Sequence, residues 1–217
     1  MDTVLKHIKR APITIILVLA NLAMMIVVVL QDPSFGGAIM LDVGASYTPM
    51  IIEQKEYYRL FTSMFLHFGV EHFASNMLLL FFLGEIVEPR LGKVKYLIVY
   101  LLGGMMGNVL SLVMDLRLPT SEMPVSAGAS GAVFALIGAM AYLLIINKGR
   151  LAGVTLQRLM ILIALSVWDG FRNNNIDGAA HIGGLIAGFL LTILLYRKSD
   201  ANRRDDDEDN VYSNRQD

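Results

Sequence analysis

Cysteine is absent from the 217 residues of this chain. Its absence excludes disulfide bonds, zinc sites built on thiolates, and iron–sulfur clusters. Charged residues are also scarce, because they form 17% of the chain, whereas a soluble domain normally carries about a quarter. What the chain has instead is apolar residues, which make up 55% of the total and occur in long blocks. The composition therefore indicates an integral membrane protein.

Six apolar segments have about the length of a membrane-spanning helix, which needs about 20 mostly apolar residues. They are Ala11–Leu30, Glu71–Val87, Val94–Met114, Ser130–Ile146, Leu151–Phe171 and Ala179–Tyr196. The fifth is the weakest, because Gln157 and Arg158 lie within it, although Arg158 could extend its charged end to the nearer interface. We therefore predict an all-α integral membrane protein. Residues 11–196 would form a six-helix bundle with a long first outer loop, from Gln31 to about Leu66.

The basic residues indicate which ends of the helices face the cytoplasm, because Lys and Arg gather on that side. One set of connections holds Lys6, Lys9, Arg10, Arg90, Lys93, Lys95, Lys148, Arg150, Arg158, Arg197, Lys198, Arg203 and Arg204. The alternate connections hold only Lys55, Arg59, Arg117 and Arg172. We therefore expect a multi-pass plasma-membrane protein with a cytoplasmic N-terminus (residues 1–10) and a cytoplasmic, disordered acidic tail (residues 197–217). No transit peptide is visible, which favours a bacterial protein.

Polar side chains inside membrane-spanning segments are costly, so each one is a candidate functional residue. If the N-terminus is cytoplasmic, the second, fourth and sixth segments all enter the membrane from its outer face. His72 and Asn76 lie near the start of the second segment, Ser130 begins the fourth, and His181 lies in the first turn of the sixth. The topology thus predicts that these four side chains share one shallow layer near the outer surface.

These residue types are the ones that acyl transfer requires. A serine hydroxyl is a weak nucleophile and needs an adjacent base, usually histidine. The oxyanion that forms needs preorganised donors, and His72, Asn76 and the backbone N–H of Ser130 are candidates. Taken alone, the small residues around Ser130 favour close helix packing, and Gly184 and Gly188 have the spacing of a packing motif. The shared depth of the four polar side chains favours a catalytic site.

Three motifs resemble those of the rhomboid family of intramembrane serine proteases, in the same order and on the corresponding helices. The residues Gly128-Ala129-Ser130-Gly131 match the GxSG motif of that family. Residues 72–76, HFASN, match its HxxxN element, and residues 180–184, AHIGG, resemble the segment that carries its catalytic histidine. The resemblance covers nearly all of the chain except the tail, and it implies a rhomboid-like bundle.

The resemblance also implies a role for each of these residues. Ser130 would be the nucleophile and His181 the base of a dyad that has no third, acidic member. His72 and Asn76, with Ser130 itself, would line the oxyanion hole. The expected supporting residues are Gly128, Gly131 and Phe134, the last of which stands where the family often has an aromatic ring against the catalytic histidine.

Other parts of the resemblance concern structure and access. His67 matches a further family histidine with a structural role, and Tyr58-Arg59 stands where the family has a Trp-Arg pair. Asp177 precedes His181 by four residues, but it lies in the polar stretch RNNNID, so we interpret it as a solvated turn residue. The family also suggests a gate at the fifth helix and around Trp168–Asn175.

Together these observations predict an intramembrane serine endopeptidase that cleaves transmembrane segments of membrane proteins near the outer face through an acyl-enzyme. Its expected partners are such substrates and the lipid bilayer, with no nucleic acid, cofactor or metal. A zinc protease would need HExxH on a helix, and this motif does not occur. A transporter would place its polar cluster near the midplane. The remaining alternative is a catalytically silent rhomboid-like chaperone or sorting factor, although such relatives typically lack the serine or the histidine.

Overall fold

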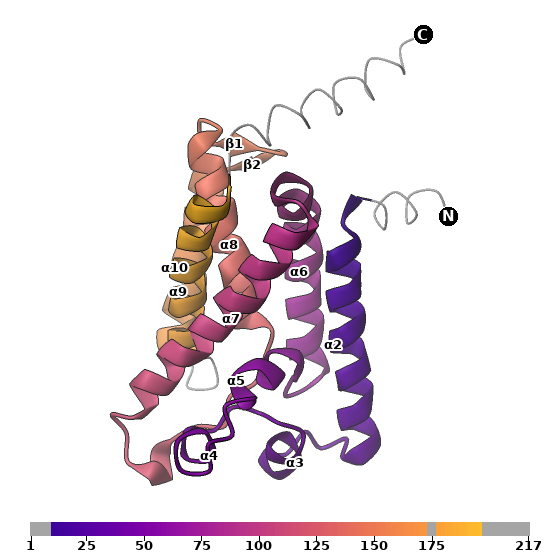
Figure 1. Cartoon of the computed structure of the whole chain (residues 1–217), viewed down its shortest axis with the longest axis vertical. Helices are drawn as coiled ribbons and strands as arrows, with labels where there is room; N and C mark the ends of the chain where they lie inside the picture. Colours follow the sequence, from indigo (N-terminus) through magenta and orange to yellow (C-terminus); the bar gives the residue numbers. More distant parts are fainter. Residues whose placement is uncertain (1–9, 173–176, 197–217) are drawn as a thin grey trace.

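Six long helices form the computed structural model, which describes residues 10–172 and 177–196 and, for residues 165–172, the backbone alone. The helices are α2 (Pro12–Gln31), α6 (Val70–Leu91), α7 (Lys93–Asp115), α8 (Ser130–Ile146), α9 (Leu156–Arg172) and α10 (Gly178–Leu195). Figure 1 shows them running alternately in opposite directions, so that α6, α8 and α10 begin at the same end of the bundle. The predicted all-α membrane fold is confirmed.

Length and composition separate the helices of this bundle. Among the described residues, α2, α6, α7 and α10 are long and apolar enough to cross a membrane, and α8 is a shorter apolar helix. Because a helix rises 1.5 Å per residue, the 17 residues of α8 span roughly 25 Å, less than the roughly 30 Å of a bilayer core. Helix α8 is therefore too short to reach both surfaces of a bilayer core of this thickness.

Helix α8 is the centre of the bundle. It is buried almost throughout, from Gly131 to Ala141 without interruption, and the largest core cluster is built around it. A helix that is apolar on all sides is typical of such a central position. Helices α6, α7, α9 and α10 all contact it.

Helices α8 and α10 touch through their backbones. A methyl group added at Gly184 would overlap the carbonyl oxygen of Gly131, and one added at Gly188 would overlap that of Ala135. Because no side chain fits there, the packing role predicted for Gly184 and Gly188 is confirmed. The contact draws the start of α10 against the start of α8.

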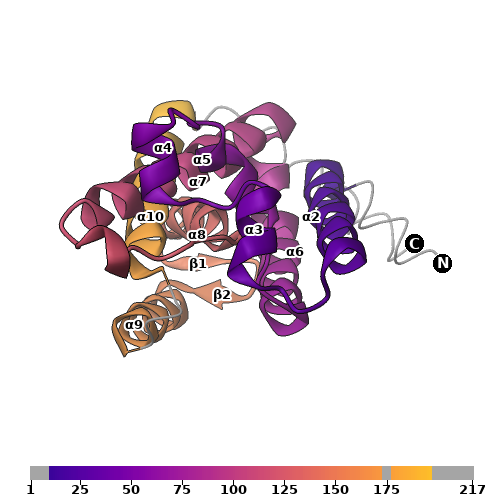
Figure 2. The ribbon, with the colours of Figure 1, turned by 90° about the horizontal axis from the view of Figure 1, so that it is seen from below.

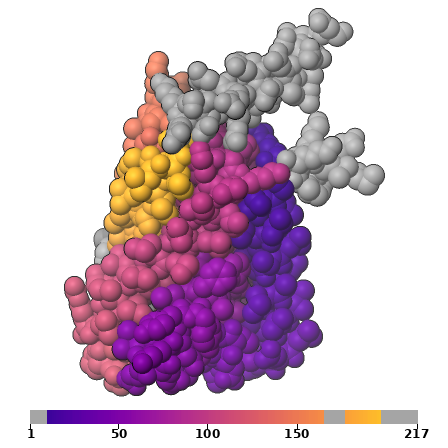
Figure 3. Space-filling model, viewed as in Figure 1, coloured from indigo at the N-terminus to yellow at the C-terminus, as the bar shows by residue number. Residues whose placement is uncertain are grey.

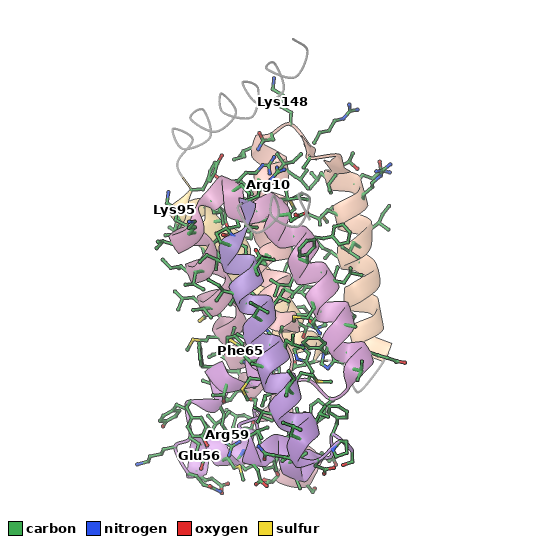
Figure 4. The ribbon with its side chains drawn as sticks, turned by 90° about the vertical axis from the view of Figure 1, so that its right-hand side faces the viewer. Arg10, Glu56, Arg59, Phe65, Lys95 and Lys148 are labelled. Carbon is green, nitrogen blue, oxygen red and sulfur yellow. The ribbon has the colours of Figure 1, made fainter. Side chains whose placement is uncertain are left out.

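The two ends of the bundle differ in charge. Figure 4 shows Arg10, Lys95 and Lys148 at one end, which we call the basic end, and Glu56 and Arg59 at the other, which we call the loop end. This separation has the pattern expected from the positive-inside rule. Which end faces the cytoplasm stays a prediction, as do the assignments of residues 1–9 and 197–217, which lie outside the described residues.

The first loop, in which the sequence showed no clear element, is largely helical. It contains α3 (Gly37–Asp42), α4 (Thr48–Glu53), α5 (Arg59–Thr62) and the 3₁₀ turn η1 (Ser63–Phe65). Figure 3 shows these early residues forming the base of the molecule beneath the long helices. The buried Arg59 holds the loop together, because it donates hydrogen bonds to the carbonyl oxygens of Leu41 and Ala45, at 2.7 and 3.0 Å. A second 3₁₀ turn, η2 (Thr120–Glu122), lies between α7 and α8.

A small β-hairpin joins α8 to α9, and no sequence pattern predicted it. Its strands are β1 (Arg150–Leu151) and β2 (Val154–Thr155), and they pair antiparallel. Helix α9 consequently begins at Leu156, five residues later than the predicted segment, and Arg158 falls in its first turn. Figure 2 shows α9 at the edge of the bundle, beside the hairpin.

Candidate active site

The four polar residues predicted to share one layer line a single pocket. It has a volume of about 1220 Å³ and lies at the loop end, where α6, α8 and α10 begin. His72, Asn76, Ser130 and His181 all line it, together with Phe134. The structure therefore brings together side chains that are up to 109 positions apart in the sequence (His72 to His181).

Ser130 is the first residue of α8, and the segment before it is held on both sides. The backbones of Ser46 and Ser126 exchange two hydrogen bonds of 2.8 Å. The N–H of Gly128 donates to the carbonyl oxygen of Ser63 at 3.0 Å, and that of Ala129 donates to Nε2 of His67 at 3.5 Å. Ser130 therefore enters its helix from a backbone that the first loop holds in place.

Gly128 brings His72 close to Ser130. Its φ of +150° is a conformation that side chains disfavour. A methyl group built there would lie 2.9 Å from Cε1 of His72 and 3.5 Å from Oγ of Ser130. The absence of a side chain at Gly128 thus leaves room for the imidazole beside the hydroxyl. Gly131 has less need to be glycine, since the nearest atom to an added methyl would be the carbonyl oxygen of Ala180 at 3.6 Å.

Asn76 lies one turn beyond His72 on α6, and it is buried. Its Nδ2 donates a hydrogen bond of 2.9 Å to the carbonyl oxygen of His72. An amide nitrogen carries two N–H groups, so this bond orients the side chain and leaves one donor for the pocket. The arrangement supplies a preorganised donor on the same side as His72.

His181 lies in the first turn of α10, with 8% of its surface exposed. Its ring stacks on that of Phe134, with centroids 4.1 Å apart and planes 10° from parallel. Nδ1 is enclosed and has no hydrogen-bond partner among the described residues, and no hydrogen bond joins His181 to Ser130 there. Catalytic hydrogen bonds are often long in a site without substrate, so the missing hydrogen bond does not argue against a catalytic pair.

Asp177 is not a solvated turn residue, and that interpretation was wrong. It is the N-cap of α10, where Oδ1 accepts a hydrogen bond from the backbone N–H of Ala180 at 2.8 Å. Oδ2 accepts a second one from the hydroxyl of Ser111 on α7, at 2.6 Å. An aspartate directly before an apolar helix is a recognised capping signal, so the sequence did contain this information. Both oxygens of Asp177 thus position the helix that carries His181.

His67 lies outside the membrane-spanning helices but is fully buried, with its ring against that of His72. Burial, together with the neighbouring His72 ring, lowers the pKa of His67 to about 3. The neutral ring can therefore accept the N–H of Ala129 at any ordinary pH, which suits the predicted structural role. The side chains of Trp168 and Asp169, and residues 173–176 of the predicted gate, lie outside the described residues.

A pocket with this lining can carry out nucleophilic chemistry. It holds a hydroxyl at a helix N-terminus, two imidazoles and an amide, together with the carboxylates of Glu71, Asp115 and Asp177. Across residues 10–172 and 177–196, no three His, Asp or Glu side chains are grouped so that they could hold a metal ion. The fold and this pocket define a class: polytopic helical membrane proteins with a serine and histidines facing a polar pocket at one end of the bundle.

The chain belongs to the rhomboid family, since the Rhomboid domain matches residues 54–198. It is 37% identical over 145 residues to rhomboid protease GluP of Bacillus subtilis, a match that covers 67% of this chain and 27% of that protein. It is 32% identical over 149 residues to the putative rhomboid protease YdcA of the same organism, covering 69% and 72%.

A plant relative matches as well. RHOMBOID-like protein 1 of Arabidopsis thaliana is 36% identical over 165 residues, which covers 74% of this chain and 41% of that protein. The matches thus span less than half of GluP and of this plant protein. The relatives support membership of a family that contains proteases.

Proposed function

We propose that this chain is an intramembrane serine endopeptidase that cleaves the transmembrane segments of other membrane proteins. The observation that carries the proposal is the common pocket at the loop end, lined by Ser130, His181, His72 and Asn76. A structural role explains each of these residues singly. It does not explain why a serine, two histidines and an asparagine from three different helices line one pocket.

In the proposed reaction His181 is the base. Its Nδ1 is enclosed, so Nε2 is the ring nitrogen that faces the pocket and accepts the proton of Ser130. Oγ of Ser130 forms a bond to the peptide carbonyl carbon, and the carbonyl electrons move to its oxygen. When this intermediate collapses, the C–N bond breaks and His181 returns the proton to the leaving amine. Water, activated by His181, then hydrolyses the acyl-enzyme.

The negative charge on the intermediate requires donors. The backbone N–H of Ser130 is one of the first N–H groups of α8, which have no acceptor within their helix. The second N–H of Asn76 and the imidazole of His72 stand beside it in the pocket lining. The N-terminus of α8 also favours negative charge through the helix dipole. One such donor typically contributes about 3 kcal/mol to the stability of a transition state.

The proposed substrate is a helix whose carbonyl groups are already hydrogen-bonded within the membrane. Such a carbonyl becomes accessible only when the helix unwinds locally, so we expect substrates with helix-weakening residues near the cut. Under the positive-inside rule, the basic end is cytoplasmic and the pocket opens to the outer face. Water would then reach the acyl-enzyme from outside the cell.

The test is cleavage of a model transmembrane substrate by the purified full chain. We expect Ser130→Ala and His181→Ala each to lower the rate about a thousandfold or more. Ser126→Ala is the matched control, because Ser126 lines the same pocket and contributes to the fold through its backbone. Cleavage that survives either of the first two substitutions would refute the dyad. Stable binding of a membrane protein without any cleavage by the wild type would favour the chaperone alternative.

A further inference from the structure

A second pocket lies at the basic end of the bundle, far from the candidate active site. The β1–β2 hairpin and the first turn of α9 form it, and its volume is about 410 Å³. Pockets that bind small ligands commonly have volumes of about 300–1,000 Å³, so this one is large enough for a phosphate-bearing headgroup. Its lining consists of residues 150–155 and Arg158.

Two guanidinium groups contribute to this lining. The side chains of Arg150 and Arg158 are exposed, and among the described residues neither has a hydrogen bond or ion pair. In the part of the chain that the structure describes, no carboxylate lines the pocket. A guanidinium presents a rigid fork of donors that matches the oxygens of a phosphate in two parallel hydrogen bonds. Two such forks beside one cavity therefore favour a phosphate as the ligand.

The surface next to this pocket is apolar. Met160, Ile161 and Leu162 follow Arg158 on α9, and their exposed fractions are 53%, 53% and 37%. Figure 2 shows that α9 stands at the edge of the bundle, where its outward side meets no other helix. In a membrane protein such a surface contacts acyl chains. The cationic pocket and the apolar surface together match a molecule with an anionic head and apolar tails.

We propose that this pocket binds the headgroup of an anionic glycerophospholipid, whose acyl chains lie along the exposed side of α9. Free phosphate would satisfy the arginines but would leave the adjacent apolar surface unused. The bound lipid attaches the start of α9 to the membrane leaflet at the basic end. This site is independent of the proposed proteolysis, because none of its residues lines the pocket of Ser130.

The test is lipid binding by the full chain in detergent, measured by native mass spectrometry with phosphatidylglycerol and with phosphatidylcholine. The double variant R150Q/R158Q should bind phosphatidylglycerol at least about tenfold more weakly, since each basic residue near an anionic lipid contributes about a factor of five. The matched control is K55Q/R117Q, which removes the same charge outside this pocket and should leave affinity within about a factor of two. Phosphatidylcholine should bind all three proteins equally and weakly.

Two further measurements distinguish a specific lipid site from general charge attraction and from a site for free phosphate. Arg158→Lys retains the charge but removes the planar fork, so it should weaken binding less than Arg158→Gln and more than no substitution. Inorganic phosphate at millimolar concentration should not displace the lipid. Equal loss in both double variants would show attraction to net charge alone and would overturn the site. Displacement of the bound lipid by inorganic phosphate would refute the lipid as the ligand and identify a free-phosphate site instead.

Discussion

At the scale of single residues, position 128 of the candidate site requires glycine. Its backbone has φ of +150°, and an added methyl group would lie 2.9 Å from the ring of His72. Backbone conformation and neighbouring side chain thus both require glycine. The sequence motif alone identifies two glycines of equal standing, whereas the structure shows that Gly131 has ordinary van der Waals space around it.

The matched pair Gly128→Ala and Gly131→Ala tests this difference. Gly128→Ala should displace His72 and cost about 1–3 kcal/mol of backbone strain, with at least a tenfold loss of proposed protease activity. Gly131→Ala should stay within about a factor of three of the wild-type rate, because an added methyl there would be 3.6 Å or more from every neighbour. Substrate cleavage and thermal unfolding are the measurements, and equal losses in both variants would contradict this account.

His67 predicts a dependence of stability on pH. Burial lowers its pKa to about 3 in the folded chain, below the ordinary value of 6.5. Between these two values the unfolded chain binds a proton that the folded chain does not. Stability is therefore fully present above about pH 6.5 and falls as the pH is lowered, by about 1.4 kcal/mol per pH unit from this residue.

The measurement is chemical unfolding in detergent at pH 7 and at pH 4.5, with His67→Gln as the comparison. The glutamine keeps an acceptor for the N–H of Ala129 but has no proton to gain. Its loss of stability between the two pH values should be smaller than that of the wild type by about 2–3 kcal/mol. Parallel losses in both proteins would show that His67 does not titrate in this way.

At the scale of elements, the sequence predicted long helices well and short ones poorly. Both bounds of α8, Ser130 and Ile146, were predicted to the residue, because the long apolar run begins at Ser130. Helices α3, α4 and α5 have four to six residues, too few to be stable by propensity. They are held by contacts such as those of Arg59 with Leu41 and Ala45, which no local pattern contains.

The contact between α8 and α10 gives a prediction at this scale. Gly188→Ala would drive a methyl group into the carbonyl oxygen of Ala135, and a backbone within a central helix has little freedom to move. We expect a loss of about 3 kcal/mol, near the upper end for overpacking, or failure to fold. Gly37→Ala is the control, because nothing lies within 4 Å of a methyl there. Thermal unfolding is the measurement, and a Gly188→Ala variant as stable as the control would refute the close contact.

At the scale of the whole molecule, a buried carboxylate joins α2 to the remaining bundle. The Rhomboid domain match begins at residue 54, so α2 lies outside it. Glu88 at the end of α6 accepts hydrogen bonds from the backbone N–H groups of Ile13 and Thr14, at 2.9 and 2.8 Å. It also accepts one from the hydroxyl of Thr14, at 2.8 Å. The first N–H groups of α2 therefore find their acceptor on another helix.

Glu88→Gln should weaken this attachment strongly. The amide that replaces the carboxylate removes the charge and turns one acceptor into a donor, which then faces donors of α2. We expect a loss of about 2–3 kcal/mol in stability. Glu122→Gln, at an exposed position in η2, should have no measurable effect. Differential scanning calorimetry of the two variants checks this prediction, and equal melting temperatures would contradict the role given to Glu88.

The end of the bundle at which each helix begins could be predicted from the sequence, because membrane topology determines it. The positions of Lys and Arg predict the direction of each helix, and that direction places His72, Ser130 and His181 in one layer. Distances within the layer could not be predicted, because they depend on backbone contacts such as Gly184 with Gly131. The hydrogen bond from Ser111 to Asp177 is likewise a tertiary feature, whereas the capping of α10 by Asp177 is local and has a sequence signal.

The most direct test of Ser130 as the nucleophile is covalent labelling of the full chain by a fluorophosphonate, with the modified residue located by peptide mass spectrometry. We expect one adduct, on Ser130, which disappears in Ser130→Ala and forms at least about a hundredfold more slowly in His181→Ala. Ser126→Ala should label at the wild-type rate, although Ser126 lines the same pocket. An adduct on another serine, or labelling that persists in Ser130→Ala, would contradict this role of Ser130.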